Sequence, residues 1–191
     1  MTSPSETGET APTDHGGSDT VQYLAPDGTP LPDADLPALS DETLVRMYED
    51  LVFARRFDER ATSLQRQGRI STWAPMAGQE ASQIASTVAM AEEDYLYPTY
   101  RDNAAKFVHG TDPAAVLARL AGHVDASDDA AVAFGAAERV FPESIPIASH
   151  LPHAVGGAMA TTYQDGDAVH VAHFGDGATS EGDFHEALNF A

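Results

Sequence analysis

A short turn late in the sequence combines residue types that could bind a phosphate. Gly175-Asp176-Gly177 follows an apolar stretch at 169–174 and precedes a proline-free segment at 181–191 whose apolar residues recur at helical spacing. Glycines permit a close backbone approach to a ligand, and the amides at the start of a helix attract an anion. The carboxylate of Asp176 would repel a phosphate unless a divalent cation lay between them, and Mg²⁺ takes oxygens of both kinds. The turn therefore predicts a metal-bridged diphosphate, with Asp176 as the metal ligand.

Other interpretations of this turn are a plain strand-to-helix turn with a capping aspartate and a nucleotide-binding loop. The glycines Gly175, Gly177 and Gly182 miss the spacing of the dinucleotide fingerprint, and Asp183 stands where a P-loop needs lysine. A dinucleotide-binding domain is therefore the weaker alternative, which binding of NAD would support.

A second group suited to phosphate is Tyr100-Arg101-Asp102, which follows the predicted strand at 94–99. Residues just beyond the carboxyl end of a strand lie where open parallel sheets bind ligands, and arginine can hold phosphate oxygens with two hydrogen bonds. A guanidinium and a phosphate charge about 4 Å apart gain about 4 kcal/mol at an intermediate dielectric constant, before desolvation. The same tripeptide could instead form an ion pair at the start of a helix.

Histidines offer the remaining candidate chemistry. His123 stands at the mouth of a predicted long loop, 122–146, and such loops are often placed over an active site. His123 is therefore a candidate catalytic residue, although an incidental histidine would look the same. Two pairs have a spacing that metal sites use, His150 with His153 and His170 with His173. Neither pair has an evident third ligand, which favours structural or surface roles.

The elements that would position these residues follow from hydrophobic periodicity. Ser40 suits the N-cap of a long amphipathic helix that ends near Gly68, and arginines in its second half are predicted to pair with Asp58 and Glu59. A loop is predicted at 70–78, and further helices are predicted at 79–90, after 102 through Phe107, at 114–120 and within 145–163. Pro113 is predicted to start the helix at 114–120. In the helix at 79–90 the predicted inward residues are Ala81, Ile84, Ala85 and Val88.

The predicted fold class is α/β, as part of a doubly wound parallel sheet. The small-residue helix within 145–163 leads by a short turn to the strand at 169–174, which is half of such a unit. Residues 1–37 are rich in Ser, Thr, Gly and Pro and precede the first basic residue, Arg46, so they predict a disordered acidic tail. Residues 38–191 are then the folded part.

Composition narrows the class of protein. The sequence has 30 acidic and 10 basic residues, a net charge of −20, and Lys106 as its single lysine. This charge disfavours nucleic acid and anionic membranes as partners, and its spread along the chain predicts a protein adapted to a high-salt cytoplasm. There is no cysteine, which excludes disulfides and thiolate sites, and no apolar run is long enough to cross a bilayer.

Three segments in combination resemble the alpha subunit of thiamine-diphosphate-dependent 2-oxo acid dehydrogenases. These subunits belong to the decarboxylating component of the pyruvate and branched-chain 2-oxo acid dehydrogenase complexes. The segments are 66–86 (RQGRISTWAPMAGQEASQIAS), Tyr100-Arg101-Asp102 with 145–160 (IPIASHLPHAVGGAMA), and 173–191 (HFGDGATSEGDFHEALNFA). The resemblance covers roughly residues 44–191 and implies the thiamine-diphosphate-binding fold.

The resemblance implies a role for each matching position. Tyr100 and Arg101 would contact the diphosphate of thiamine diphosphate, and Asp176 would bind Mg²⁺. The turn around the diphosphate would be Gly175, Gly177 and Ala178. Ile147 would lie beside the aminopyrimidine and Ser149 matches a small hydroxyl position, whereas His150 stands where the family is expected to carry glutamine.

The resemblance also implies a reaction and partners. The family decarboxylates a 2-oxo acid, such as pyruvate or a branched-chain acid, and passes the acyl group to a lipoyl group on an acyltransferase. A glutamate from a beta subunit completes the site, so a heterotetramer is expected. An asparagine that the family supplies to Mg²⁺ would lie beyond Ala191, so the chain is predicted to be the amino-terminal half of a longer subunit. The alternative is a non-catalytic product with only partner-binding or weak anion-binding capacity, and a genuine stop after Ala191 in the coding sequence would favour it.

Overall fold

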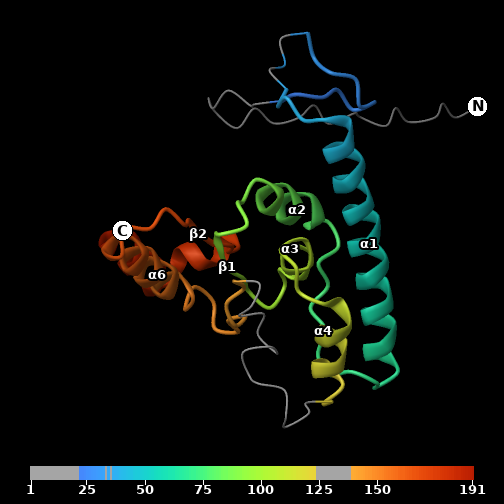
Figure 1. Ribbon diagram of the computed structural model, residues 1–191. Coiled ribbons are helices and arrows are strands. Elements are labelled where there is room, and N and C mark those ends of the chain that lie inside the picture. The colour runs from blue at the N-terminus through green and yellow to red at the C-terminus, as the bar shows by residue number, and fades with distance from the viewer. Residues whose placement is uncertain (1–21, 33, 35, 124–138) are drawn as a thin grey trace, which may run out of the picture. The chain divides into compact units, whose positions relative to one another are not determined.

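The computed structural model describes residues 22–32, 34, 36–123 and 139–191, and the chain divides into two compact units after Leu39 (Figure 1). In the first unit, Leu24 and Pro30 form an antiparallel bridge around a tight turn. Asp27 stabilises that turn, because its carboxylate accepts hydrogen bonds from the amide and the hydroxyl of Thr29. The predicted disordered tail at 1–37 falls largely outside the described residues and stays a prediction.

The second unit begins with the long helix α1, Asp41–Arg66. Its N-cap is Ser40, whose hydroxyl accepts a hydrogen bond from the amide of Thr43 at 3.1 Å. Apolar residues at helical spacing bury one face, namely Ala54, Phe57, Ala61 and Leu64. The predicted start and end of this helix are confirmed.

Three shorter helices lie beside α1 (Figure 1): α2, Glu80–Val88, α3, Asn103–Val108, and α4, Pro113–Leu120. Edge-to-face aromatic contacts join Phe57 of α1 to Phe107 of α3, with ring centroids 4.7 Å apart, and to Trp73 of the loop at 70–78, with ring centroids 5.6 Å apart. α4 begins as its sequence predicts, because Pro113 occupies the first turn and the carboxylate of Asp112 caps the amide of Ala114.

The predicted inward face of α2 is partly wrong. Ile84 is buried, but Ala81 and Ala85 are exposed, and the buried positions beside Ile84 are the polar residues Gln83 and Thr87. Their polar atoms are satisfied: Gln83 Oε1 accepts from the amide of Ala104 at 3.1 Å, and the Thr87 hydroxyl donates to the carbonyl of Gln83. These hydrogen bonds allow two polar side chains to be buried at positions that a pattern of apolar residues does not predict.

The predicted pairing of the α1 arginines is also only partly right. Arg56 does pair with Glu59 at 3.1 Å on the exposed face, but Arg55 pairs with Glu80 of α2 at 2.6 Å. Asp58 is buried and accepts hydrogen bonds from Trp73 Nε1 and from the amide of Met76, both at 2.9 Å. Its partners belong to the loop at 70–78 rather than to its own helix.

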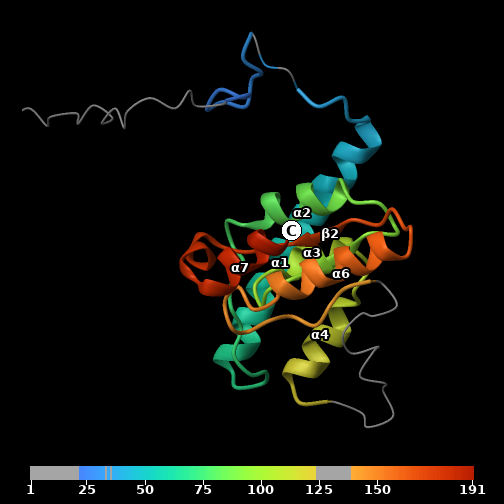
Figure 2. The same cartoon turned by 90° about the vertical axis from the view of Figure 1, so that its left-hand side faces the viewer.

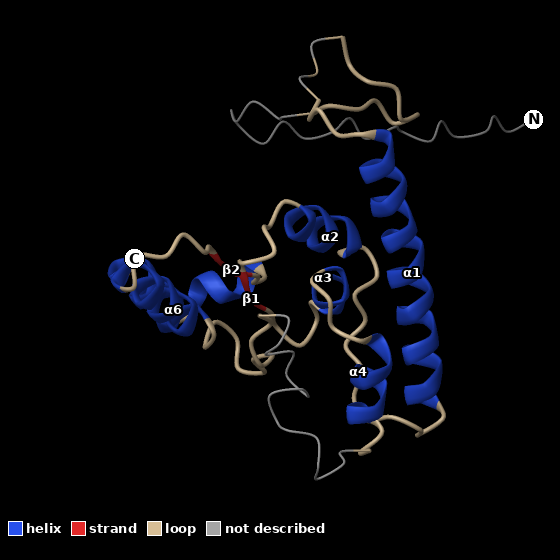
Figure 3. Ribbon diagram, in the orientation of Figure 1, coloured by secondary structure: helices blue, strands red, loops and turns tan. Residues whose placement is uncertain are grey.

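The sheet has two parallel strands, β1, Tyr95–Tyr97, and β2, His170–Ala172 (Figure 3). Leu96 is opposite Val171 in their register. On the other edge of β1, Val140 and Ser144 form parallel bridges to Leu96 and Thr99. β1 therefore lies between β2 and the segment 139–144, and all three run in the same direction.

Helices cover both faces of this sheet. α6, Leu151–Tyr163, packs on the face that carries Tyr97 and His170, and the opposite face buries Leu96 against Ala105 of α3. A short 3₁₀ helix, η2, Asp176–Ser180, follows β2 and leads to α7, Gly182–Phe190, which packs against α6 (Figure 2). The α/β class is confirmed, whereas the full doubly wound sheet stays a prediction.

Gly157 fixes the close approach of α6 to the sheet. A Cβ atom there would clash with the Tyr97 hydroxyl and lie 2.5 Å from His170 Nδ1, whereas a Cβ atom at the adjacent Gly156 would meet nothing within 4 Å. We expect Gly157→Ala to lower the free energy of unfolding by about 1–3 kcal/mol. The control Gly156→Ala should raise it by up to about 1 kcal/mol through helix propensity. Urea denaturation of both variants tests this, and equal stabilities would show that α6 does not pack as described.

Within the part of the chain that the structure describes, no helix has the length and apolar character needed to span a membrane.

Candidate functional site

The carboxyl ends of the three parallel segments open onto one cleft of about 590 Å³. Tyr100 and Arg101 follow β1, the η2 turn follows β2, and Ile147 follows the segment 139–144. The predicted site residues that line the cleft are Tyr100, Arg101, Ile147, Gly175, Asp176, Gly177 and Ala178. Because they come from three places in the sequence, their meeting at one edge of the sheet follows from the parallel topology.

Arg101 lines the cleft and is oriented by the loop at 70–78. Its Nη1 donates to the carbonyl of Pro75 at 2.5 Å, and its guanidinium lies 5.7 Å from the centroid of the Tyr100 ring. A guanidinium has five N–H donors, so this contact leaves donors for an anion. The alternative of an ion pair with Asp102 is wrong, because that carboxylate accepts from the amide and hydroxyl of Thr99 at 2.7 and 2.6 Å.

The turn at Asp176 is open on its ligand side. A Cβ atom at Gly175 or Gly177 would meet nothing within 4 Å, and neither glycine has a positive φ. The backbone therefore does not require glycine at either position, contrary to the tight turn expected from the sequence. Free space above the turn is what a bulky anion such as a diphosphate needs.

Metal binding at this turn would depend on Asp176, which is exposed. Among the described residues, no three His, Asp or Glu side chains are close enough together to hold a metal ion. Mg²⁺ tolerates such a site, since it commonly takes one or two carboxylates and completes its shell with phosphate oxygens and water. The residues present thus fit a metal that binds together with a diphosphate, and not a metal held by protein alone.

One histidine of each pair, His153 or His170, has a surface or structural role, whereas His150 and His173 line the cleft. His170 Nδ1 hydrogen-bonds the Tyr97 hydroxyl at 2.9 Å, and its Nε2 hydrogen-bonds the Thr161 hydroxyl at 2.8 Å. His153 is exposed on α6. For these two residues, this agrees with the roles favoured by the sequence.

One wall of the cleft has an unusual backbone. Ala148 is fully buried and has a φ of 66°, a left-handed conformation that residues other than glycine rarely adopt. Ser149 does not line the cleft. Its hydroxyl hydrogen-bonds the Ser144 hydroxyl and donates to the carbonyl of Pro146. His150 lines the cleft, and its Nε2 donates to the carbonyl of His173 at 2.6 Å.

A polar wall formed by α2 and His173 was not predicted. Ser86 Oγ and His173 Nε2 are 3.0 Å apart. Burial lowers the pKa of His173, an effect that Asp102 opposes and His150 reinforces, so its ring is neutral at pH 7. The other polar residues on this wall are Gln79, Ser82 and Gln83. Their helical spacing was the available signal, because polar residues on one face of a helix can line a cleft as well as meet solvent.

His123 does not line the cleft. It is exposed just after α4, and its amide donates to the carbonyl of Ala118 at 2.9 Å. Most of the long loop predicted over the site, residues 124–138, lies outside the described residues.

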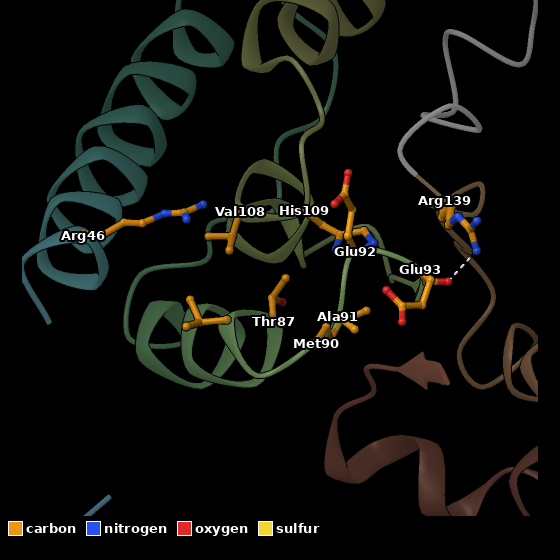
Figure 4. Close-up of a pocket in the computed structure, with 10 residues that line it drawn as sticks. Arg46, Thr87, Met90, Ala91, Glu92, Glu93, Val108, His109 and Arg139 are labelled. Atoms are coloured by element: carbon orange, nitrogen blue, oxygen red, sulfur yellow. Dashed lines mark hydrogen bonds between the residues drawn. The ribbon is translucent and has the colours of Figure 1, made fainter. Parts of the chain in front are cut away.

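A second cavity, of about 790 Å³, lies near the ends of α2 and α3 (Figure 4). Arg46 reaches toward it from α1, and Arg139 on the opposite side donates from Nη1 to the carbonyl of Glu93 at 2.5 Å. Glu92 and Glu93 balance the two arginines, so the cavity has no dominant charge. None of the predicted site residues lines it.

Comparisons with known proteins match most of the chain. The profile of the family described as dehydrogenase E1 component matches residues 48–191. The 3-methyl-2-oxobutanoate dehydrogenase subunit alpha of Mycobacterium tuberculosis (strain ATCC 25618 / H37Rv) is 41% identical over 178 residues, which cover 90% of this chain and 46% of that protein. The pyruvate dehydrogenase E1 component subunit alpha of Staphylococcus aureus (strain N315) is 37% identical over 171 residues, 90% of this chain and 45% of that protein.

The chain thus spans about half the length of the curated relatives that it matches. The matches confirm the predicted resemblance to alpha subunits of 2-oxo acid dehydrogenases, and the chain belongs to the dehydrogenase E1 component family.

Proposed function

We propose that this chain supplies the diphosphate-binding and magnesium-binding half of a thiamine diphosphate site in a 2-oxo acid dehydrogenase. The observation that carries the proposal is the meeting of Arg101 with the Asp176 turn across one cleft at the carboxyl ends of β1 and β2. A cation and a carboxylate that line the same cleft suit a diphosphate with a bound divalent cation.

Each wall has a distinct task in this proposal. Arg101 and Tyr100 bind diphosphate oxygens, and the loop at 70–78 orients Arg101 through the carbonyl of Pro75. Asp176 holds Mg²⁺, while the space over Gly175 and Gly177 admits the diphosphate. Ile147, half-exposed in the cleft, offers an apolar contact to the rest of the ligand. When bound, thiamine diphosphate supplies the carbanion that attacks the 2-oxo group and the ring that accepts the electron pair.

We further propose that the site is shared with a beta subunit and that the acyl group passes to a lipoyl acyltransferase, in a heterotetrameric enzyme that acts on pyruvate or a branched-chain 2-oxo acid. The relatives named as alpha subunits support the beta subunit. An apolar groove of about 730 Å³ between α6, β2 and α7 supports a partner surface, since large side chains at its rim are exposed. They include Met159, Tyr163, Leu188 and Phe190.

A non-catalytic chain with weak anion binding is the second candidate. One observation favours it: in the described part of the chain, Asp176 does not belong to any cluster of three possible metal ligands. The two candidates differ in whether Mg²⁺ increases the affinity for thiamine diphosphate.

A titration of the ¹⁵N-labelled chain with thiamine diphosphate, with and without Mg²⁺ in molar salt, tests the proposal by NMR. We expect weak binding that Mg²⁺ strengthens, with shifts at the amides of Arg101, Gly175 and Gly177. Arg101→Gln should weaken binding about tenfold or more, because it removes charge-assisted hydrogen bonds. Arg56→Gln, on the exposed face of α1, is the control and should leave the Kd unchanged.

Three outcomes would contradict the proposal: shifts confined to the second cavity, binding independent of Mg²⁺, or equal binding of NAD. The last would support the dinucleotide interpretation.

A further inference from the structure

Three charged side chains meet between helices α3 and α4 and the segment 139–144, which runs beside β1. Lys106 Nζ of α3 lies 2.7 Å from Glu143 Oε2, and Arg119 of α4 pairs with the other carboxylate oxygen, Oε1. The side chains of Lys106 and Glu143 are 6% and 13% exposed, so both charges are withdrawn from water. Glu143 thus bridges two cations that come from two different helices.

Burial and pairing compete in this cluster. Burial lowers the pKa of Lys106, although the charge of Glu143 opposes the shift. Burial would raise the pKa of Glu143, but the charge of Lys106 and hydrogen bonds from Arg119 and Lys106 outweigh it and leave this pKa below its usual value. The carboxylate is therefore ionised at neutral pH, and its two partners compensate its charge.

Glu143 stands at the base of one wall of the cleft. The next residue, Ser144, lines the cleft, as do Ile147 and Ala148. Near this wall, two backbone hydrogen bonds join the chain to β1 and its extension. The amide of Phe141 donates to the carbonyl of Leu96 at 2.8 Å, and the amide of Ser144 donates to the carbonyl of Pro98 at 3.3 Å. The strained Ala148 persists only where the surroundings impose its conformation. The wall therefore needs an anchor.

We propose that Glu143 is a positioning residue for the cleft, which holds the wall at 144–148 in place through Lys106 and Arg119. A buried ion pair adds little stability relative to well-packed apolar residues of similar size, whereas loss of one partner leaves an uncompensated charge. The cluster thus fixes the position of a segment more than it adds stability. The proposal rests on the proposed function only for the identity of the ligand.

Hydrogen exchange of the 191-residue chain tests the position of the wall without a ligand. Glu143→Gln keeps the side-chain shape but removes the charge. We expect the amides of Ser144 and Leu151 to exchange about tenfold faster or more, because both donate to carbonyls at or beside the wall. The amide of His173, which bonds the carbonyl of Tyr97, should keep its rate. The control Glu59→Gln breaks the exposed pair with Arg56 and should change neither set.

A double variant separates positioning from stability. Lys106→Met with Glu143→Leu replaces the pair by apolar side chains and leaves Arg119, which is 30% exposed, free to reach water. We expect Glu143→Gln alone to lower the thermal midpoint, because it leaves Lys106 without its counter-charge, and to raise the Kd for Mg²⁺ with thiamine diphosphate about tenfold. In the double variant the thermal midpoint should return near that of the wild type, while exchange at Ser144 and Leu151 stays fast and the Kd stays about tenfold higher.

Two results for Glu143→Gln would overturn the proposal: faster exchange at all amides alike, or no change in exchange at Ser144 and Leu151. The proposal would also fail if the double variant regained both the thermal midpoint and the slow exchange of Ser144 and Leu151. If the wild-type chain binds no thiamine diphosphate, the proposed function fails, and the exchange rates still decide the role of Glu143.

Discussion

Replacing Asp58 with alanine is expected to lower the free energy of unfolding by about 3 kcal/mol or more. Asp58 is 4% exposed, and its Oδ1 accepts two hydrogen bonds, one from the indole of Trp73 and one from the amide of Met76. Alanine would leave both donors buried without a partner. The expected cost is that of two unsatisfied groups rather than of a lost surface charge.

The loss should also reach the cleft. Trp73 and Met76 belong to the same loop as Pro75, whose carbonyl holds Arg101. When the loop loosens, Arg101 loses its orientation, so weaker binding of a diphosphate should accompany the loss of stability.

Urea denaturation followed by fluorescence of Trp73, the single tryptophan of the sequence, measures the stability effect. Asp58→Asn keeps one carbonyl oxygen as an acceptor and should cost less than alanine. The matched control is Glu59→Ala, which removes a neighbouring carboxylate that is 57% exposed and should change stability by less than about 0.5 kcal/mol. If Asp58→Ala and Glu59→Ala are equally stable, Asp58 does not hold the loop.

Elements whose signals are local in sequence were predicted well. The Ser40 cap and the Pro113 start depend on side chains within three residues of the helix end, and the structure has both. The parallel pairing of the strands at 95–97 and 170–172 also placed Tyr100, Arg101 and the Asp176 turn at one edge. There the prediction needed only the direction of the strands, not their side-chain packing.

Polar contacts between distant segments were not predicted, because the partners are far apart in the sequence. Asp58 and Trp73 are 15 residues apart, Lys106 and Glu143 are 37 apart, and Ser86 and His173 are 87 apart. A charged or polar residue on a helix is assigned to the surface unless its tertiary partner is known. The α2 wall of the cleft, the anchor at Glu143 and the role of Asp58 were missed for this one reason.

Asp176→Asn is expected to abolish the effect of Mg²⁺ on the binding of thiamine diphosphate. In the wild-type chain, Mg²⁺ should raise the affinity at least about tenfold, because it separates the carboxylate from the phosphate oxygens. Without Mg²⁺ the variant should bind slightly better than the wild type, since the repulsion between Asp176 and the diphosphate is removed. Two opposite changes from one substitution distinguish a metal ligand from a residue that only shapes the turn.

Calorimetry or NMR titration of both proteins, with and without Mg²⁺, measures this cycle in molar salt. Asp183→Asn is the matched control: it removes the same charge in the first turn of α7 and should leave the Mg²⁺ effect intact. Mn²⁺ added together with thiamine diphosphate gives a second measurement, since its paramagnetism should broaden the amides near Gly177 in the wild type and not in Asp176→Asn. Tight, Mg²⁺-dependent binding that survives in Asp176→Asn would mean that another group holds the metal. Asp176 would then not be the metal ligand, and Arg101 alone among the predicted site residues would account for anion binding.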